Sequence, residues 1–218
     1  YVGSGYRASR TAIDKLLAKQ TAEKIGVPTP AAQQLGPTAT LDLAPPVVLK
    51  PLTEGSSFDI YFCHTADDVA AAREELHAHH AFILAERCVT GRELTVAILD
   101  ADPLPVIEIV PATDFYDYEA KYDRSDTQYR FEIDLPAETM TMLTQHAVDM
   151  HLEIACRHVS RVDFLVDDAG RPWFLEINTM PGFTDHSLVP KAAAEAGLAM
   201  PGLCDRLVQL AVRDHHGR

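Results

Sequence analysis

Four polar residues in the segment SRVDFLVDDAGRPWFLEIN have the types and spacing of a site that binds a cation or a phosphate group. Alternate residues of a strand face the same side, so Arg161 shares a face with Asp163, and Glu176 shares a face with Asn178. The tight turn DDAG between the two runs predicts a hairpin that lays one pair beside the other. We therefore expect two carboxylates, an amide and a guanidinium to meet on one patch of a sheet.

These ligand types favour Mg²⁺ or Mn²⁺, because all-oxygen ligands suit these ions, and phosphate oxygens and water complete their octahedral shells. No histidine or cysteine joins the group, which disfavours Zn²⁺. The alternative is a cluster of surface salt bridges. The apolar residues Leu165, Phe174 and Leu175 imply a largely buried hairpin and argue against that alternative.

A lysine followed by a loop of small residues forms a second candidate site, in LKPLTEGSSFD. Lys50 stands near the end of an apolar strand, where its ammonium and the backbone N–H groups of residues 55–57 could grip phosphate oxygens. The segment is not a P-loop, because it lacks the motif G-x-x-x-x-G-K-[ST]. The alternative is an ordinary hairpin loop rich in serine and glycine.

Two further segments place polar groups where a ligand could bind. In ILAERCVTGREL, a buried strand ends in Glu86 and Glu93 follows a short turn, so the two carboxylates could hydrogen-bond a nucleobase and a ribose. The alternative is a pair of exposed acids at a turn. In MPGFTDHSLVP, Ser187 stands at the start of a helix, where free N–H groups suit a carboxylate. A role for Ser187 as a helix cap alone is the alternative.

The polar segment FYDYEAKYDRSDTQY (115–129) carries four tyrosines and has neither strand alternation nor a clean helical stripe. Long loops are uncommon in compact domains unless they have a function. We expect a lid over residues 112–135 that closes the site and excludes water. The tyrosine rings would give the lid bulk for packing and hydroxyls for anchoring. The alternative is an ordered surface loop with packed aromatic rings.

The hydrophobic pattern predicts the elements that position these residues. A first helix begins with Ser9 as its cap and ends at Gly26. The following block, to residue 90, has the predicted order β-β-β-α-β, a compact α+β unit. In the last block we expect strands over 92–100 and 103–112, a helix over about 136–157, the hairpin, a helix that starts at Ser187 and a final helix over about 200–212.

The length, composition and net charge of the chain limit the class of protein to which it can belong. The 218 residues, 47% of them hydrophobic, suffice for one large or two small domains. With 19 Lys and Arg against 32 Asp and Glu, the formal net charge is −13, which disfavours nucleic acid and anionic membranes as partners. No apolar run is long enough to span a bilayer, and no signal peptide opens the chain. The scattered cysteines predict reduced thiols in or near the core of a cytosolic protein: Cys63, Cys88, Cys156 and Cys204.

Taken in order, six segments resemble the ATP-grasp ligases and, within them, the D-alanine–D-alanine ligase family. The segments are GSGYRAS…DK, LKPLTEGSS, AERCVTGRELTVAIL, FYDYEAKY…TQY, SRVDFLVD and LEINTMPGFTDHSLVPKAA. The resemblance implies an α+β ATP-grasp fold, in which two subdomains with antiparallel sheets grip ATP between them. It divides the chain into a leading loop and helix (1–26), a central subdomain (27–90) and a C-terminal subdomain (91–218) with the metal site and the lid.

The resemblance also implies a cytoplasmic enzyme of peptidoglycan precursor synthesis that uses ATP and two Mg²⁺ (or Mn²⁺) ions to join two D-alanines. The first carboxylate is phosphorylated to D-alanyl phosphate, the amine of the second D-alanine attacks it, and phosphate leaves. Metal ions and basic residues neutralise the crowded anionic oxygens. The implied partners are small molecules, ATP and D-alanine, and the resemblance suggests a homodimer.

Residues at matching positions take the family's ligand-binding roles by resemblance. The implied metal ligands are Asp163, Glu176 and Asn178. The implied phosphate-binding groups are Lys15, Lys50 and the loop that contains Glu54, Ser56 and Ser57. Adenine is implied to meet Glu86, Arg87 and the backbone near Val89, and the ribose to meet Glu93.

The catalytic roles are likewise implied by resemblance. Arg161 and the N–H of Gly182 would stabilise the tetrahedral oxyanion. The carboxylate of the second D-alanine would bind at Ser187 and Leu188. In the lid, Lys121 would reach the transferred phosphoryl group, and Tyr122 would pair with Ser56 to close the site.

The sequence departs from the family's pattern in three places. The family has an N-terminal domain of about a hundred residues, a usual domain size, and we expect a chain that lacks it to bind ATP weakly and ligate poorly. The loop reads EGSSFDI where the family reads EGSSVGV, so Asp59 adds a carboxylate near the phosphates at a position that favours glycine. After TQY, the residues RFEID stand where the family usually has Pro-Ala.

Two alternatives to the D-alanine–D-alanine activity stay open at this point. One is a related ligase whose second substrate is D-lactate, D-serine or another amino acid; the pair Lys121–Tyr122 favours D-alanine over D-lactate by resemblance. The other is a catalytically incomplete ATP-binding fragment.

Overall fold

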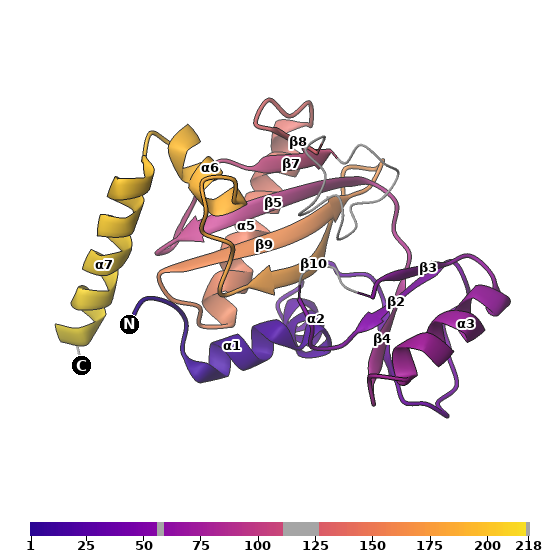
Figure 1. The fold of residues 1–218 in the computed structure, drawn as a ribbon. Coiled ribbons are helices and arrows are strands. Elements are labelled where there is room, and N and C mark those ends of the chain that lie inside the picture. Colours follow the sequence, from indigo (N-terminus) through magenta and orange to yellow (C-terminus); the bar gives the residue numbers. More distant parts are fainter. Residues whose placement is uncertain (56–58, 111–126, 217–218) are drawn as a thin grey trace.

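The computed structural model describes residues 1–55, 59–110 and 127–216, and within these ranges the strands form two antiparallel sheets (Figure 1). The smaller sheet has the strand order β1-β4-β2-β3. Its strands are β1 (Ala32–Leu35), β2 (Val47–Pro51), β3 (Tyr61–Cys63) and β4 (Ile83–Arg87), with helix α3 (Ala66–His77) packed against β2 and β3. The predicted order β-β-β-α-β is therefore confirmed.

Helix α3 forms because its start is capped and one of its faces is apolar. Thr65 Oγ1 accepts a hydrogen bond from the N–H of Asp68, and Asp68 Oδ2 accepts one from the N–H of Thr65, which is a reciprocal capping box. Val69, Ala72 and Leu76 recur at helical spacing and are buried against the smaller sheet. These contacts fix the strands that carry Lys50 and Glu86.

The larger sheet has six strands in the order β10-β9-β5-β7-β8, with β6 paired to β5. Its strands are β5 (Arg92–Leu99), β6 (Asp102–Pro103), β7 (Ile107–Val110), β8 (Gln128–Arg130), β9 (Val159–Val166) and β10 (Pro172–Asn178). The long strands β5 and β9 pair over their full length, so the predicted hairpin β9–β10 extends a rigid centre. Two antiparallel sheets with flanking helices confirm the α+β fold class.

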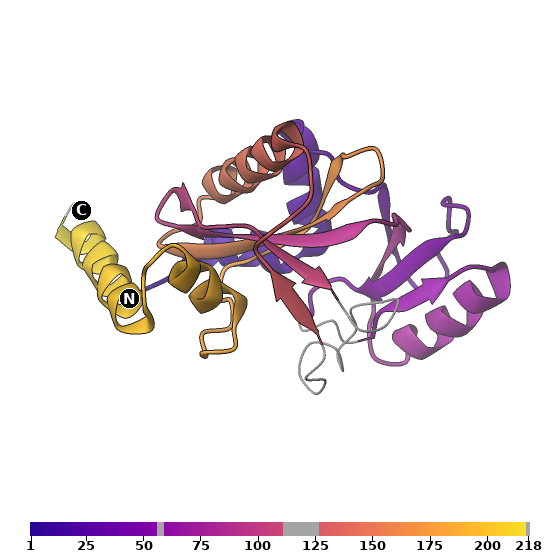
Figure 2. The same ribbon diagram turned by 90° about the horizontal axis from the view of Figure 1, so that it is seen from above.

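The two faces of the larger sheet have different coverings. On one face, Val96, Val162 and Phe164 belong to a core completed by α2 (Lys15–Lys24) and α5 (Ala137–Glu153). On the other face, Ala97 and Ile107 belong to a core completed by α6 (Leu188–Glu195) and α7 (Met200–His216). Figure 2 shows α5 and α6 on opposite sides of the sheet. The site described below uses the same face as α6, further along the strands.

The first helical segment differs from its prediction. Two helices, α1 (Tyr6–Ile13) and α2, replace the single helix expected from Ser9 to Gly26, and Ser9 lies inside α1. The break occurs at Asp14, whose carboxylate accepts hydrogen bonds from the N–H groups of Leu16 and Leu17, both 3.1 Å long. The capping carboxylate satisfies N–H groups that a new helix leaves unpaired, so it starts α2 with Lys15 as the first residue.

Two other expectations are corrected. The predicted lid over residues 112–135 is not all loop, because β8 pairs with β7 and places Arg130 opposite Glu108. Lys121 and Tyr122, with the rest of 111–126, lie outside the described residues. Cys204 is exposed rather than near the core, whereas Cys63 and Cys156 are buried as predicted.

The link between the sheets is short, since β4 ends at Arg87 and β5 begins at Arg92. The division of the chain into segments 1–26, 27–90 and 91–218 stays a prediction. Among the described residues, no helix combines the length and apolar character that crossing a membrane requires.

An ion pair at the end of β5 gives a prediction for the pH dependence of stability. Arg213 binds both oxygens of Asp100 at 2.8 Å, and this hydrogen bonding holds the pKa of Asp100 below 3.8, against the effect of burial. A lowered carboxyl pKa adds stability above the unfolded-state pKa, and that stability is lost as pH falls through the folded-state pKa. We expect Asp100→Asn to lower the free energy of unfolding by about 1 kcal/mol at pH 7, with the difference disappearing as the pH falls through the lowered folded-state pKa of Asp100.

Denaturant unfolding at several pH values measures this effect. Asparagine suits the backbone at this position, where φ is +67°, so the substitution tests the charge and not the conformation. Asp102→Asn, at an exposed carboxylate two residues away, is the matched control and should change little. Equal stability of Asp100→Asn and the parent protein at pH 7 would contradict the prediction.

Candidate active site

The hairpin β9–β10 brings the four predicted polar residues together. Glu176 lies directly opposite Asp163, and Asn178 lies directly opposite Arg161. The alternation of the sequence predicted this meeting, and the structure confirms it. The roles of these residues as metal ligands or catalytic groups are a separate matter, and they remain predictions.

A β-bulge in β10 decides which way Glu176 points. Phe174 pairs with Phe164 in the apolar core, whereas Glu176 pairs with Asp163 on the opposite face, because the register shifts between Phe174 and Glu176. In a regular strand, residues 174 and 176 would face the same side. The extra residue Leu175 therefore turns the carboxylate of Glu176 away from the core, as bulges beside active sites commonly do.

Arg161 and Asp163 form a buried ion pair. The Nε and Nη2 atoms of Arg161 donate to the two carboxylate oxygens of Asp163 at 2.9 and 2.8 Å. Thr95, opposite Asp163 on β5, donates from its hydroxyl at 2.6 Å. Both charged residues are only 6% exposed, so the alternative of a surface salt-bridge cluster is wrong. The bidentate contact fixes the guanidinium plane.

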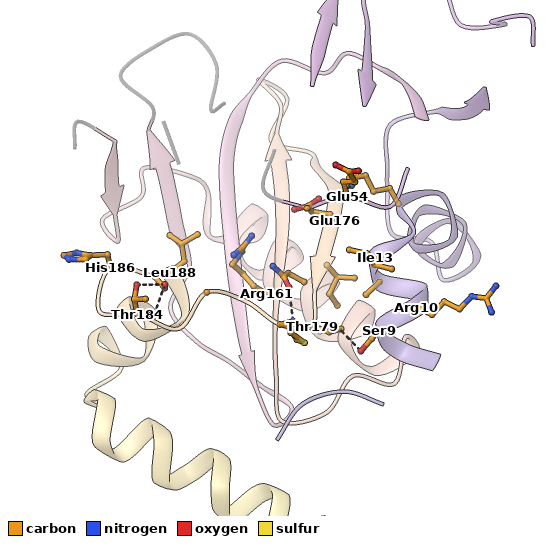
Figure 3. A pocket seen from close by; sticks show the side chains of 18 of the residues that line it. Ser9, Arg10, Ile13, Glu54, Arg161, Glu176, Thr179, Thr184, His186 and Leu188 are labelled. Carbon is orange, nitrogen blue, oxygen red and sulfur yellow. Dashed lines mark hydrogen bonds between the residues drawn. The ribbon is translucent and has the colours of Figure 1, made fainter. Parts of the chain in front are cut away.

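A pocket of about 910 Å³ opens between α1, the hairpin and the start of α6 (Figure 3). In Figure 3, Glu54 and Glu176 lie near each other at one end, Arg161 lies in the middle, and Leu188 marks the side of α6. Among the predicted site residues, those that line it are Lys15, Glu54, Arg161, Glu176, Asn178, Gly182, Ser187 and Leu188. Asp163 is not among the described lining residues, although it neighbours two that are.

Lys15 joins α2 to the segment that leads into the small-residue loop. Its N–H donates to the carbonyl of Leu52 at 3.1 Å, and its ammonium donates to the carbonyl of Glu54. Burial lowers the pKa of Lys15, and the nearby carboxylate of Glu176 opposes this effect. The pocket therefore holds a desolvated ammonium close to the carboxylate that the bulge turns toward it.

Lys50 and Glu86 are buried and paired, which excludes the alternative of exposed acids for Glu86. Lys50 Nζ lies 2.6 Å from Glu86 Oε2, and Lys19 Nζ lies 2.8 Å from Glu86 Oε1. Burial opposes the ionisation of Glu86, and the two ammonium groups overcome it, so the pKa of Glu86 is lowered. Neither Lys50 nor Glu86 is among the described residues that line the pocket.

The loop after Lys50 carries a strained aspartate. Asp59 adopts φ +56°, the left-handed conformation expected from the family's glycine at this position. Its Oδ2 lies 3.7 Å from Nε2 of His80, while Oε1 of Glu54 lies 3.6 Å from Nδ1 of the same ring. The added carboxylate thus faces a histidine. Ser56 and Ser57, which precede it, lie outside the described residues.

The residues predicted to meet adenine and ribose lie at the link between the sheets. Arg87 is exposed, and its guanidinium lies over the ring of Trp173, 5.0 Å from the centroid. Val89 and Glu93 flank Gly91 and are half-buried. The structure therefore places these three residues at the edge where the two sheets meet, apart from the lining of the pocket.

Ser187 stands at the N-cap of α6, but its hydroxyl makes no capping hydrogen bond within the helix. The Oγ atom instead accepts from the N–H of Thr184 at 3.0 Å. A Cβ at position 182 would lie 2.9 Å from this Oγ, so Gly182 lets the turn pass close to Ser187. The first turn of α6 thus keeps N–H groups that Ser187 does not cap, beside a pocket that Leu188 lines.

Several positions that line the pocket were not predicted as site residues from the sequence. The pocket is also lined by residues of α1, of β8 and of the turn before α6: Ser9, Arg10, Ile13, Tyr129, Thr184 and His186. Lys19 was missed as well, although its position four residues after Lys15 places both lysines on one face of α2. That spacing was the one available signal.

Comparisons with known proteins agree with the family resemblance seen in the sequence. A family profile described as "D-ala D-ala ligase C-terminus" matches residues 31–209. A D-alanine–D-alanine ligase of Bordetella pertussis is 44% identical over 213 residues, which cover 94% of this chain and 67% of that protein. The chain therefore spans about two thirds of the length of this relative.

Solved structures with a similar fold are ligases of the same kind. The D-alanine–D-alanine ligase of Bacillus anthracis superposes with a TM-score of 0.88 at 31% identity, covering all of this chain and 73% of that one. The same ligase complexed with ATP gives a TM-score of 0.86 at 27% identity, covering 72% of that chain. The VanG D-Ala:D-Ser ligase of Enterococcus faecalis gives 0.84 at 28% identity, covering 96% of this chain and 64% of that one.

Proposed function

The chain belongs to the D-alanine–D-alanine ligase family. We propose that it joins two D-alanines with the energy of ATP, for peptidoglycan precursor synthesis. One D-alanine carboxylate attacks the γ-phosphorus of ATP, which gives D-alanyl phosphate and ADP. The amine of the second D-alanine then attacks the acyl carbon, the C–O bond to phosphate breaks, and phosphate and a proton leave.

The observation that carries this proposal is the register of the hairpin. Glu176 lies opposite Asp163, and Asn178 lies opposite Arg161, so carboxylate, amide and guanidinium groups line one side of a pocket. Lys15 enters the same pocket from α2, and the uncapped start of α6 enters it from the other side. Phosphoryl and acyl transfer need such convergent charge at one place.

Mg²⁺ or Mn²⁺ fits the donor set of the hairpin, because the side-chain oxygens of Asp163, Glu176 and Asn178 are hard ligands. Glu176, at the bulge, would hold the ions together with Asp163 and Asn178. When bound, the ions supply charge neutralisation for the phosphate oxygens of ATP. Asp163 already holds Arg161, so its carboxylate would orient the guanidinium and a metal ion together.

The chain's own residues then bind and orient the substrates. Lys15 and Lys50 would hold phosphate oxygens of ATP together with Glu54 and with Ser56 and Ser57, the two serines lying outside the described residues. The adenine is held near Glu86, Arg87 and Val89, and the ribose at Glu93. These assignments rest on the family's motif positions; among the described residues, Lys15 and Glu54 line the pocket, Lys50 is paired with Glu86, and Arg87 lies over the ring of Trp173.

The acyl end of the reaction uses the other side of the pocket. Arg161 and the N–H of Gly182 stabilise the oxyanion that forms at the acyl carbon. Ser187 and Leu188, at the start of α6, take the carboxylate of the second D-alanine, where the helix N-terminus favours an anion. Lys121 would reach the transferred phosphoryl group and Tyr122 would pair with Ser56; all three residues lie outside the described ranges. The homodimer and the cytoplasmic location remain predictions.

The test is ADP release by the full-length protein with D-alanine alone, and with D-serine or D-lactate added as second substrate. We expect D-alanine-dependent ADP release and a D-alanyl-D-alanine product by mass, with the mixed products slower by about tenfold or more. A preference for D-serine or D-lactate would replace the second substrate in this proposal. Absence of any D-alanine-dependent ADP release would overturn it.

A further inference from the structure

One buried lysine touches both sheets behind the pocket. Lys19, on α2, is 1% exposed and its ammonium has three partners. It lies 2.9 Å from Oγ1 of Thr29, 2.8 Å from Oε1 of Glu86 and 3.5 Å from the carbonyl oxygen of Phe174. Glu86 belongs to β4 of the smaller sheet, and Phe174 belongs to β10 of the larger one. A single ammonium group therefore connects the two halves of the fold.

On the side of the smaller sheet, Lys19 holds Glu86, and Glu86 holds Lys50. The carboxylate is shared, one oxygen to each ammonium, and all three side chains are buried. Burial lowers the pKa of Lys19 to about 8, with Lys50 adding to the effect and the carboxylates of Glu86 and Glu176 opposing it. A buried ammonium group is tolerated only where its ionic and hydrogen-bonding partners compensate for its lost hydration. The arrangement fixes the position of the Lys50 side chain.

On the side of the larger sheet, the same ammonium lies at the bulge. Phe174 is the last residue of β10 before the register shifts toward Glu176. Its N–H donates to the carbonyl of Pro28 at 2.8 Å, and its carbonyl accepts from the hydroxyl of Thr29 at 2.8 Å. Because β10 is an edge strand, these contacts satisfy backbone groups that no neighbouring strand pairs. Lys19 in turn holds the hydroxyl of Thr29.

We propose that Lys19 is a positioning residue of the ligase reaction, which sets Lys50 on the smaller sheet and the bulge before Glu176 on the larger sheet at one fixed separation. The proposal rests on the proposed function. Lys19 does not line the pocket among the described residues, so it acts through Glu86 and Thr29 and not on a substrate. A displacement of about 1 Å at a reacting group can cost about 10²-fold in rate.

Lys19→Met is the first test, because methionine keeps the length and apolar stem of the side chain and removes the ammonium. We expect kcat for D-alanine-dependent ADP release to fall by about 10- to 100-fold and the KM for ATP to rise severalfold. The control is Lys24→Met on the same helix, where the ammonium is exposed and pairs with Glu153. Lys24→Met should leave both constants unchanged. Wild-type kinetics in Lys19→Met would overturn the proposal.

Thr29→Val is a second test of the positioning role, and it applies even if Lys19→Met fails to fold. Valine matches threonine in shape but lacks the hydroxyl that joins Lys19 to the Phe174 carbonyl. We expect kcat to fall by about tenfold with the KM for ATP nearly unchanged, because this change affects the bulge and not Lys50. Thr29→Ser restores the hydroxyl and should restore kcat. Equal kcat in Thr29→Val, Thr29→Ser and the parent protein would count against the link to the bulge.

Binding of ATP with Mg²⁺, measured by calorimetry, separates this proposal from the proposed function. If the parent protein binds ATP but does not ligate D-alanine, the proposed function fails. In that case Lys19→Met should still weaken ATP binding severalfold relative to Lys24→Met, because the Lys50 side chain loses its fixed position. Equal ATP affinity of the two variants would overturn the positioning role of Lys19 whatever the parent's activity.

Discussion

Replacing Glu176 with glutamine is expected to lower the rate of D-alanine-dependent ADP release by about 10²-fold or more while the fold stays intact. Glu176 lines the pocket and lies opposite Asp163, and the bulge turns its carboxylate away from the core. Glutamine keeps the shape of the side chain but removes the charge that would hold the metal ions. The carboxylate of Glu176 also raises the pKa of Lys15 against the effect of burial. Without this negative charge the pKa of Lys15 falls further, and its ammonium group loses a proton more readily.

ADP release at increasing Mg²⁺ concentration measures both the loss of rate and the loss of metal binding. We expect Glu176→Gln to need a higher Mg²⁺ concentration for half of its maximal rate, together with the lower rate, and to keep an unchanged midpoint of thermal unfolding. The matched control is Asp168→Asn, which makes the same change from carboxylate to amide at an exposed position in the turn of the same hairpin. Parent-like turnover by Glu176→Gln would remove the metal assignment.

Replacing Gly91 with alanine is expected to lower the free energy of unfolding by about 3 kcal/mol. Gly91 stands in the four-residue link between β4 and β5, and its Cα passes close to the end of β9. An added Cβ would lie 2.3 Å from the carbonyl oxygen of Val166 and 2.8 Å from its carbonyl carbon. The obstacle is backbone in a paired strand and not the tip of a flexible side chain, so either the link or the end of β9 must shift.

Thermal unfolding measures this effect, and a loss of about 3 kcal/mol corresponds to a midpoint lower by about 6 to 12 °C. Gly36→Ala is the control, because the nearest atom to its added Cβ would be a ring carbon of Phe82 at 3.7 Å, an ordinary contact. A shift of the link should also raise the KM for ATP in Gly91→Ala, since the residues assigned to adenine and ribose flank this glycine. An unfolding midpoint equal to that of Gly36→Ala would contradict the prediction.

The parts of the fold that follow from short-range pattern were predictable from the sequence. The alternation around Asp163 and Glu176 and the DDAG turn determined the hairpin, and turn geometry within four residues set its pairing. The helix α3 and the strands on either side of it followed from apolar spacing. Both patterns are local, so no distant contact was needed to see them.

The parts that depend on distant contacts were not predictable. Lys19 looked like an ordinary helix lysine, and its role depends on Glu86 and Phe174, which are 67 and 155 residues away. Strand β8 was hidden in a tyrosine-rich segment, because three residues carry too little alternation to indicate a strand without the neighbouring β7. The break between α1 and α2 was missed since Asp14 fits a helix interior and a cap equally well until its carboxylate is seen on the N–H groups of Leu16 and Leu17.

The extra residue in β10 has a consequence for how this protein tolerates changes in length. Surface loops accept insertions and deletions at small cost, but removing Leu175 would not shorten a loop. It would remove the bulge, and Glu176, then next to Phe174 in a regular strand, would still face the side opposite Phe174 and pair with Asp163. The loss of one residue at the bulge therefore keeps Glu176 and Asn178 on the pocket face, whereas the loss of Ile177, in the regular part of the strand, would turn Asn178 to the core face.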